Sequence, residues 1–268
     1  MSIRQHFTRA RARVAFPVLG IAMGIGTLIT GLERTAYLGS AAGVEQAPPS
    51  TASSAVGTLT EDLAALTGVK RAPVEAPSSF AELNTDYQHP QVDKWVARLT
   101  TGARGDFKNS LNRMEKYEDM ILAKIEAKGM PRELIYLALI ESNFNPTAQS
   151  PVRAVGLWQF MSPTAREYGL SVGRKVDERK HPAKSTDAAL TYLTQLHKRF
   201  GSWYLAAAAY NSGQGTVSKA MRSVTGKTKG TDADFFRIMK KLPKETQDYV
   251  PKLIATAKVG SERAKYGL

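Results

Sequence analysis

The sequence predicts an all-α domain from about residue 80 to residue 268, behind an amino-terminal membrane segment and a linker. After residue 80, apolar residues recur at the three- and four-residue spacing of helices that bury one face. Residues typical of helix starts and ends stand at the limits of these stretches. No stretch alternates apolar and polar residues for long enough to predict a sheet. We therefore expect a single globular helical domain, with at most a minor hairpin of β-structure.

Residues 1–40 predict a membrane segment. Four arginines between Arg4 and Arg13 precede an uncharged stretch from Val14 to Leu32. A helix of that length, at ~1.5 Å per residue, measures about 28 Å, close to the ~30 Å hydrocarbon core of a bilayer. Because basic residues favour the cytoplasmic side, we expect one span with the following residues outside the cytoplasm. Glu33 and Arg34 follow before any small-residue cleavage site, which favours an anchor over a cleaved signal segment, the alternative.

Residues 41–79 are rich in Ala, Pro, Ser and Thr and poor in large apolar side chains, a composition typical of a flexible linker. Residues 80–268 then form the remaining domain. Caps and apolar spacing predict helices there over residues 92–99, 105–129, 131–140, 162–169, 185–201, 203–210, 231–239 and 245–259. The helix that Pro131 opens is apolar nearly all round, so we expect it to be buried. Pro251 predicts a bend or a restart in the last helix.

Composition excludes several classes of function. The chain has no cysteine, which excludes disulfides, thiolate metal sites and a cysteine nucleophile. Its four histidines are scattered and form no HExxH pair, so we expect neither a metal nor a cofactor. The formal net charge of +13 favours an anionic partner. No surface of interleaved aromatic and basic residues is apparent, so we expect no nucleic acid, and we expect a monomer.

Glu141 is the candidate general acid. It stands at the carboxyl end of the apolar helix that follows Pro131. Apolar neighbours and the negative end of the helix dipole both raise the pKa of a carboxyl group. A rise of about two units from ~4.3 corresponds to about 2.7 kcal/mol, which desolvation can supply. From the residues alone, a Glu141 that points to solvent or caps a neighbouring group remains the alternative.

Several stretches together resemble the lysozyme-like lytic transglycosylases, bacterial enzymes that cleave the glycan strands of peptidoglycan. The stretches are residues 141–146 (ESNFNP), Ser150, residues 156–161 (GLWQFM) and residues 209–213 (AYNSG). The membrane-bound D branch is the most similar, because residues 131–134, 177–179 and 245–252 also have counterparts there. The resemblance covers roughly residues 85–260 and includes none of the LysM modules that close relatives carry.

This resemblance implies a lysozyme-like fold and a function. Glu141 is implied to be the lone catalytic acid and then base, acting between N-acetylmuramic acid and N-acetylglucosamine. The muramic acid's own 6-hydroxyl attacks, so that a 1,6-anhydro ring forms without water. The implied partner is the peptidoglycan glycan strand. With the expected span, the domain would be periplasmic on a bacterial inner membrane, or exported if the amino-terminal segment is cleaved.

The resemblance also implies the substrate-binding residues. Ser150 resembles a serine that bonds the acetamido group or holds Glu141, and Tyr249 resembles a tyrosine whose hydroxyl approaches the acid. The full implied set is Ser150, Gln159, Met161, Tyr210, Asn211, Glu245 and Tyr249. Without the resemblance, Ser150 fits a Ser-Pro turn, Tyr210 and Asn211 fit a helix end, and Glu245 and Tyr249 fit a surface pair. Trp158 is expected in the core.

Two other functions remain open. A hydrolytic muramidase of goose-lysozyme type shares the fold and the acid, but water attacks in place of the 6-hydroxyl. A second carboxylate, Glu245 or Asp177, within roughly 5 to 10 Å across the cleft would favour hydrolysis. A non-catalytic peptidoglycan-binding protein is the other alternative.

Overall fold

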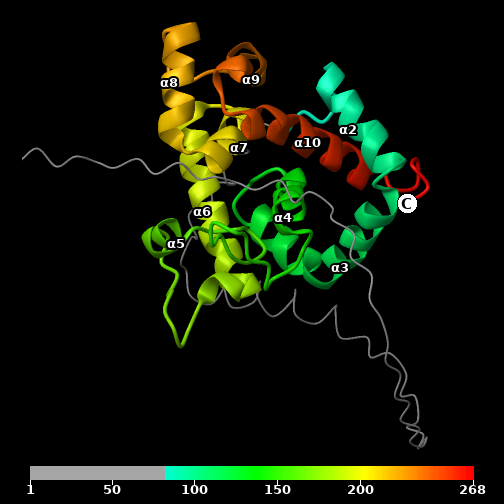
Figure 1. Cartoon of the computed structure of the whole chain (residues 1–268), viewed down its shortest axis with the longest axis vertical. Helices are drawn as coiled ribbons and strands as arrows, with labels where there is room; N and C mark the ends of the chain where they lie inside the picture. The colour runs from blue at the N-terminus through cyan, green and yellow to red at the C-terminus, as the bar shows by residue number, and fades with distance from the viewer. Residues whose placement is uncertain (1–81) are drawn as a thin grey trace, which may run out of the picture. The chain divides into compact units, whose positions relative to one another are not determined.

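The computed structural model describes residues 82–268, which form helices and connecting loops (Figure 1). The predicted membrane segment (1–40) and the predicted linker (41–79) lie outside the described residues. The α-helices are α2 (Pro90–Thr100), α3 (Arg104–Glu126), α4 (Ile135–Ser142), α5 (Ser162–Glu167), α6 (Pro182–Phe200), α7 (Trp203–Ser212), α8 (Gln214–Thr225), α9 (Asp232–Ile238) and α10 (Lys244–Ser261). The 3-10 helices are η1 (Arg132–Leu134), η2 (Glu178–Lys180) and η3 (Met239–Lys241). Within the described residues, no helix combines the length and hydropathy needed to cross a bilayer.

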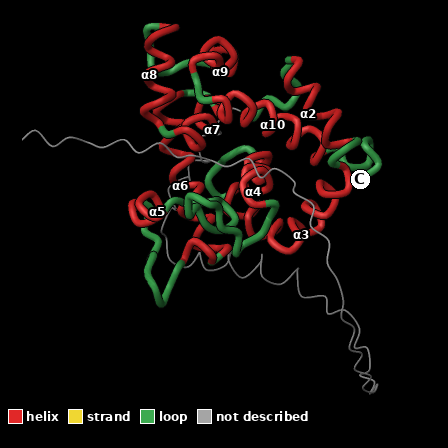
Figure 2. Tube along the Cα trace, viewed as in Figure 1, coloured by secondary structure: helices red, strands yellow, loops and turns green. Residues whose placement is uncertain are grey.

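The helical class predicted from the sequence is confirmed for the described residues, which contain no strand (Figure 2). Isolated antiparallel bridges join Gln149 to Val155, Val155 to Phe160, and Val172 to Asp177. The first two lie in the loop between α4 and α5. These bridges are isolated, so residues 82–268 do not form the minor hairpin of strands that the sequence allowed.

The core is built around α4 and α7. All ten residues of α7 are buried, and four consecutive alanines (206–209) let its neighbours pack close to its backbone. α10 packs against α2, α4 and α7. It approaches α4 at Gly260, where a Cβ would lie 2.3 Å from Cε1 of Tyr136. The absence of a side chain at that position therefore sets how closely α10 meets α4.

Several helices differ from those that the sequence predicted. α6 begins at Pro182 rather than at Ser185, because His181 is its N-cap and accepts a hydrogen bond from the N–H of Lys184. The Ser185 hydroxyl instead donates back to a carbonyl group one turn earlier. α10 continues as one helix through Pro251. α8 was not predicted at all.

Arg179 fixes the loop from Ala148 to Phe160. Its buried guanidinium donates through Nη1 to the carbonyl oxygens of Arg153 and Phe160, both at 3.0 Å. Its Nε and Nη2 atoms donate to the two carboxylate oxygens of Asp177, at 2.8 and 2.7 Å. The planar guanidinium offers donors in fixed directions, so one side chain ties the loop to residues 177–179.

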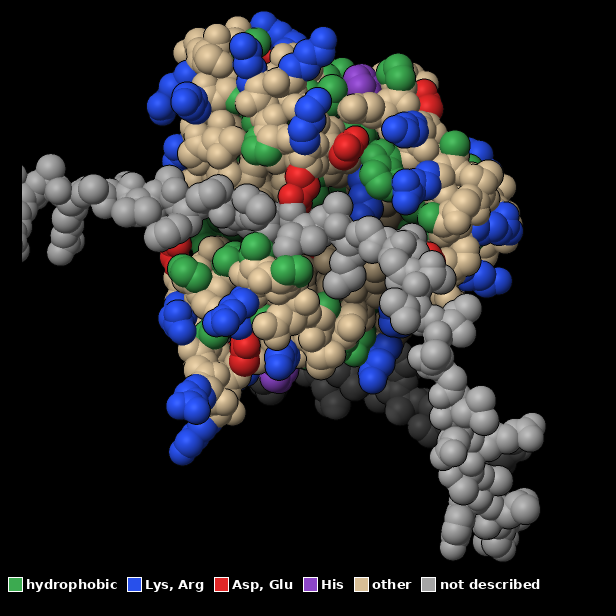
Figure 3. Space-filling view, in the orientation of Figure 1, with side chains coloured by type: hydrophobic (Ala, Val, Ile, Leu, Met, Phe, Trp, Pro, Cys, Tyr) green, Lys and Arg blue, Asp and Glu red, His purple; other side chains and the backbone are tan. Residues whose placement is uncertain are grey.

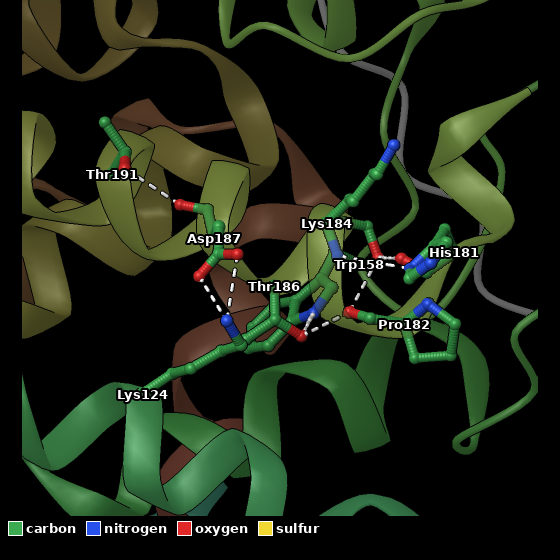
Figure 4. A network of polar contacts seen from close by, with 9 residues as sticks. Lys124, Trp158, His181, Pro182, Lys184, Thr186, Asp187 and Thr191 are labelled. Carbon is green, nitrogen blue, oxygen red and sulfur yellow. Dashed lines mark hydrogen bonds and ion pairs between the residues drawn. The ribbon is translucent and has the colours of Figure 1, made fainter.

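Trp158 anchors the same loop to α6 and is fully buried, as the sequence predicted. Its Nε1 donates to the hydroxyl of Thr186 at 3.0 Å, and that hydroxyl donates to the carbonyl oxygen of Pro182 at 2.7 Å (Figure 4). At the next residue of α6, Asp187 pairs with Lys124 of α3 at 2.7 Å. The same turn of α6 therefore contacts both the loop, through Thr186, and α3, through Asp187.

Replacing Gly156 by alanine is expected to destabilise the domain strongly. Gly156 has φ +90°, and a Cβ there would lie 1.9 Å from the carbonyl oxygen of Arg179, a backbone atom that cannot rotate away. We expect a loss of roughly 2 to 5 kcal/mol in the free energy of unfolding, measured by denaturant titration.

Gly226→Ala is the matched control, because Gly226 also has a positive φ but a Cβ there would meet no atom within 4 Å. This variant should lose only about 1 kcal/mol. Equal losses for the two variants would contradict the close approach between the loop and Arg179.

Candidate active site

The carboxyl group of Glu141 meets α10 at the end of α4. The Tyr249 hydroxyl donates a hydrogen bond to Oε1 of Glu141 at 2.6 Å. The two residues are 108 positions apart, so the contact exists only in the folded domain. α4 ends here because Asn143 adopts a left-handed conformation, with φ 51°, and its N–H bonds the carbonyl oxygen of Leu139. The local sequence therefore places Glu141 at a helix end, and the packing of α10 gives it a partner.

Two hydroxyl groups hold the turn from Gly156 to Met161 beside this helix end. The Oγ atom of Ser142 lies 2.9 Å from the carbonyl oxygen of Leu157. The buried Tyr210 hydroxyl donates to the carbonyl oxygen of Trp158 at 2.7 Å. The turn is therefore bonded both to α4 and to α7, the two helices of the core.

Burial in largely apolar surroundings raises the pKa of Glu141 from 4.5 to about 7. The hydrogen bond from Tyr249 and the positive charge of Lys252 act in the opposite direction, and the nearby Glu245 raises the pKa further. Burial also raises the pKa of Tyr249 well above its usual value, so its hydroxyl remains a donor near neutral pH. The Glu141 side chain keeps partial exposure to solvent. Glu141 can therefore exchange a proton near neutral pH.

Lys252 belongs to this group of residues, and the sequence analysis did not single it out. It follows Tyr249 by three positions on α10, and its ammonium group lies 5.5 Å from the centre of the Trp95 ring. Burial lowers the pKa of Lys252, while the negative charges of Glu141 and Glu245 raise it. Helical spacing could have identified it, because residues at positions i, i+4 and i+7 of α10 share one face.

Asn211 joins the end of α7 to the start of α10. Its Nδ2 donates to Oε1 of Glu245 at 3.1 Å, and its Oδ1 accepts from the Thr246 hydroxyl at 2.7 Å. Burial raises the pKa of Glu245, and the hydrogen bond from Asn211 opposes this rise. Asn211 is itself buried, so its amide orients Glu245 and does not face solvent.

A row of aromatic rings extends from Tyr210 across α6 to the end of α5. The ring centres of Tyr210 and Tyr192 are 5.3 Å apart, and those of Tyr192 and Tyr168 are 4.8 Å apart. Phe160 meets Tyr210 edge to face at 6.3 Å. The sequence analysis singled out neither Tyr192 nor Tyr168. Spacing along the chain gave no sign that rings from three helices would meet.

Of the three predicted residues of the loop between α4 and α5, Ser150 and Gln159 bond the main chain through their side chains. The Ser150 hydroxyl accepts a hydrogen bond from the N–H of Ala154 at 2.9 Å and caps a turn. Gln159 donates through Nε2 to two main-chain carbonyl groups, at 2.9 and 3.3 Å. Met161 is half-buried at the N-cap of α5. In the part of the chain that the structure describes, none of these three side chains is hydrogen-bonded to Glu141.

The predicted residues Tyr249, Glu245, Asn211 and Tyr210 are thus brought close to Glu141 or to one another by side-chain contacts or by charge. Burial raises the pKa of Tyr210, and the charge of Glu141 adds to this rise. Across residues 82–268, no cluster of three His, Cys, Asp or Glu side chains could hold a metal ion. The side chains gathered around Glu141 offer carboxyl, hydroxyl, amide and ammonium groups.

The central part of the chain is similar to a known protein family. The family model described as "Transglycosylase SLT domain" matches residues 119–232. A curated relative, membrane-bound lytic murein transglycosylase D of Escherichia coli strain K12, is 41% identical over 157 residues. This alignment covers 58% of the present chain and 34% of the relative, so the chain spans about a third of that protein's length.

Two further similarities are more distant. Peptidoglycan transglycosylase gp16 of Escherichia phage T7 is 31% identical over 145 residues, which cover 53% of this chain and 10% of the phage protein. Among solved structures, the 70 kDa soluble lytic transglycosylase Slt70 from Escherichia coli aligns with a TM-score of 0.47 and 20% sequence identity. That alignment covers 76% of this chain and 40% of the other.

The raised pKa of Glu141 predicts a pH-dependent loss of stability. Because the pKa is 4.5 before folding and about 7 after it, the folded protein binds an extra proton between these values. Stability therefore falls as pH rises from 4.5 through 7, by roughly 3 kcal/mol, and stays low above 7. Glu141→Gln removes the titrating group and keeps an acceptor for Tyr249, so this variant should escape the loss.

We expect Glu141→Gln to be more stable than the wild-type protein at pH 8, with the difference shrinking toward pH 5, in denaturant titrations at both pH values. Glu115→Gln, which changes an exposed carboxylate on α3, is the control and should follow the wild-type protein. A Glu141→Gln variant that gains nothing at pH 8 would refute the burial of this carboxyl group.

Proposed function

Because residues 119–232 carry a transglycosylase SLT domain, we propose that this protein is a lytic transglycosylase of peptidoglycan. It cleaves the β-1,4 bond between N-acetylmuramic acid and N-acetylglucosamine without water. The observation that carries the proposal is the Glu141 carboxyl group, which has a pKa of about 7 and accepts a hydrogen bond from Tyr249 at 2.6 Å. An acid with a pKa near the working pH suits general acid and base catalysis.

In the proposed reaction, protonated Glu141 gives its proton to the glycosidic oxygen. The bond from this oxygen to C1 of muramic acid breaks, and the oxygen leaves as the 4-hydroxyl of N-acetylglucosamine. The Glu141 carboxylate then takes the proton of the muramic acid 6-hydroxyl, whose oxygen forms a bond to C1. Glu141 regains its proton, and the product carries a 1,6-anhydro ring. The Tyr249 hydroxyl and the Lys252 ammonium stabilise the carboxylate between the two proton transfers.

Substrate binding in this proposal draws on the residues around Glu141. Tyr192 and Tyr168 are half-buried and offer ring edges and faces of the kind that pack against sugars, and the buried Tyr210 ring packs against Tyr192. Asn211 and Glu245 form a bonded polar pair next to the acid. Ser150, Gln159 and Met161 lie on the loop that borders it. The fold proposed with this function is lysozyme-like.

A hydrolytic muramidase is the second candidate, and Glu245 favours it. Its pKa is raised by burial and its charge raises the pKa of Glu141, so the two carboxyl groups are close enough to interact. A water molecule between them would replace the 6-hydroxyl as the attacking group. Asp177 is a weaker second carboxylate, because its hydrogen bonds from Arg179 hold its pKa low and fix it in the loop contact.

The proposal includes a place in the cell. Residues 14–32 span a bacterial inner membrane once, and residues 41–79 connect the span to a periplasmic domain that works as a monomer. Sequencing the amino terminus of the mature protein tests the anchor. A start near Met1 supports an uncleaved span, whereas a start after residue 34 would mean that the segment is removed and the domain is exported.

Replacing Glu141 by glutamine should abolish cleavage and preserve binding. Digested sacculi are analysed by mass spectrometry, and wild-type protein should release fragments with 1,6-anhydro ends. Loss of both proton transfers should slow cleavage at least ~10³-fold, while co-sedimentation with sacculi persists. Glu115→Gln serves as the matched control and should cleave at the wild-type rate. Reducing ends would establish hydrolysis, and cleavage unchanged in Glu141→Gln would overturn the role of this residue.

Replacing Tyr249 by phenylalanine should shift the pH dependence of cleavage to higher pH. A general acid must be protonated, so kcat/KM of the wild-type protein should fall as pH rises through about 7. The Tyr249 hydroxyl lowers the pKa of Glu141, so its removal should raise that pKa and move the alkaline limb upward. The control, Tyr266→Phe, should leave the limb in place. A limb that moves downward in Tyr249→Phe would contradict the direction of this hydrogen bond.

A further inference from the structure

Residues 214–244, called here the basic lobe, carry an unusual concentration of positive charge. The lobe comprises α8, α9, η3, their connections and the first residue of α10, Lys244, with eight Lys or Arg and two acidic residues in all. The other described residues have 22 basic and 17 acidic side chains, so charges there are nearly balanced. All eight basic side chains of the lobe are exposed. Figure 3 shows blue side chains gathered around α8 and α9.

The two acidic residues of the lobe do not offset this charge over its surface. Asp232 is half-buried and accepts a hydrogen bond from the Ser202 hydroxyl. Asp234 caps α9 through Thr231 and pairs with Arg237 at 2.6 Å. The other seven basic side chains of the lobe are exposed. A surface of this kind attracts polyanions and raises their local concentration.

The lobe begins and ends at the candidate active site. The chain leaves the site after Asn211, forms the lobe, and returns at Glu245. Two hydrogen bonds hold the ends of the lobe together: Asn211 donates to Glu245 at 3.1 Å, and Thr246 donates to Asn211 at 2.7 Å. A polymer bound beside Glu245 therefore has the basic lobe as its neighbour on one side.

We propose that the basic lobe binds the free carboxylates of the peptide stems that peptidoglycan strands carry. This inference rests on the proposed function, because it extends the substrate of the same site. A glycan strand with its cleaved bond at Glu141 presents stems at neighbouring muramic acid residues, and each stem ends in at least one carboxylate. Lysine and arginine ammonium and guanidinium groups bind such carboxylates, weakly one by one and additively over several contacts.

Other polyanions fit the lobe less well. Insertion into a lipid surface needs exposed apolar side chains, and the large apolar residue that stands out as exposed among residues 82–268 is Val176, outside the lobe. Single-stranded nucleic acid needs free aromatic faces for stacking. Here Phe235 is buried, and Phe236 stacks on Tyr87 with ring centres 4.3 Å apart.

The test compares two triple variants with the same change in charge. The lobe variant is Lys219→Gln/Lys240→Gln/Lys241→Gln, on α8 and η3. The control variant is Lys94→Gln/Lys108→Gln/Lys116→Gln, at exposed lysines of α2 and α3. Cleavage is measured on two substrates: sacculi with intact stems, and glycan strands from which an amidase has removed the stems. Circular dichroism and thermal unfolding verify that both variants fold.

On intact sacculi, the lobe variant should show KM raised roughly tenfold with kcat unchanged, and a weaker dependence of KM on salt. On stripped strands, it should match the wild-type protein, and the control variant should match it on both substrates. An equal effect of the two triple variants, or an equal loss on both substrates, would overturn the proposal.

Two outcomes separate this inference from its alternatives. If wild-type protein cleaves neither substrate, the proposed function itself fails, whatever the lobe binds. If the lobe variant loses binding to phosphatidylglycerol vesicles while its KM on intact sacculi stays at the wild-type value, the lobe binds a membrane and the stem proposal is wrong.

Discussion

The hydrogen bond from the Tyr249 hydroxyl to Glu141 depends on how closely α10 packs against α4. α4 is buried because it is apolar on nearly every side, and that same burial makes a negative charge at its end unfavourable. α10 approaches α4 where Gly260 faces the Tyr136 ring. The stability of the domain and the raised pKa of Glu141 therefore depend on the same packing, because the contacts that form the core also bury this carboxyl group.

The residues around this bond come from distant parts of the chain and share few polar contacts. Asn211 links α7 to α10 through Glu245 and Thr246, and Tyr210 links α7 to the turn that carries Trp158. Each of these links uses a buried or half-buried side chain with a defined partner. Such links are effective inside a protein, because an unpaired polar group there is costly. The site is thus fixed by a small number of bonds between well-packed helices.

The sequence predicted most helices because their signals are local. The apolar character of α4 and the caps of α7 and α9 are visible within a few residues. α8 was missed although Val217, Ala220 and Met221 follow helical spacing, since Gly213 and Gly215 at its start are typical of loops. The start of α6 was misplaced because Ser185 and Thr186 resemble caps but lie within the first turn.

The site was predictable only in part. Glu141 could be singled out from the residues, because one carboxylate at the end of an apolar helix is unusual. Its contact with Tyr249 spans 108 positions, and no spacing rule predicts such a pair, so only the family resemblance placed them together. The contact of Arg179 with the loop had no local signal at all, since its acceptors are carbonyl groups 19 and 26 positions earlier.

The main-chain acceptors of Arg179 affect which positions of the loop can change in sequence. Arg179 binds main-chain oxygens, which every residue type provides, and the bridges of Val155 with Gln149 and Phe160 also use the main chain. The shape of the loop is therefore independent of many of the side chains that it displays. Outward-facing positions such as Gln149 are free to diversify while the backbone keeps its course. A loop built in this way allows ligand preference to evolve by substitution alone, without insertions or a new backbone path.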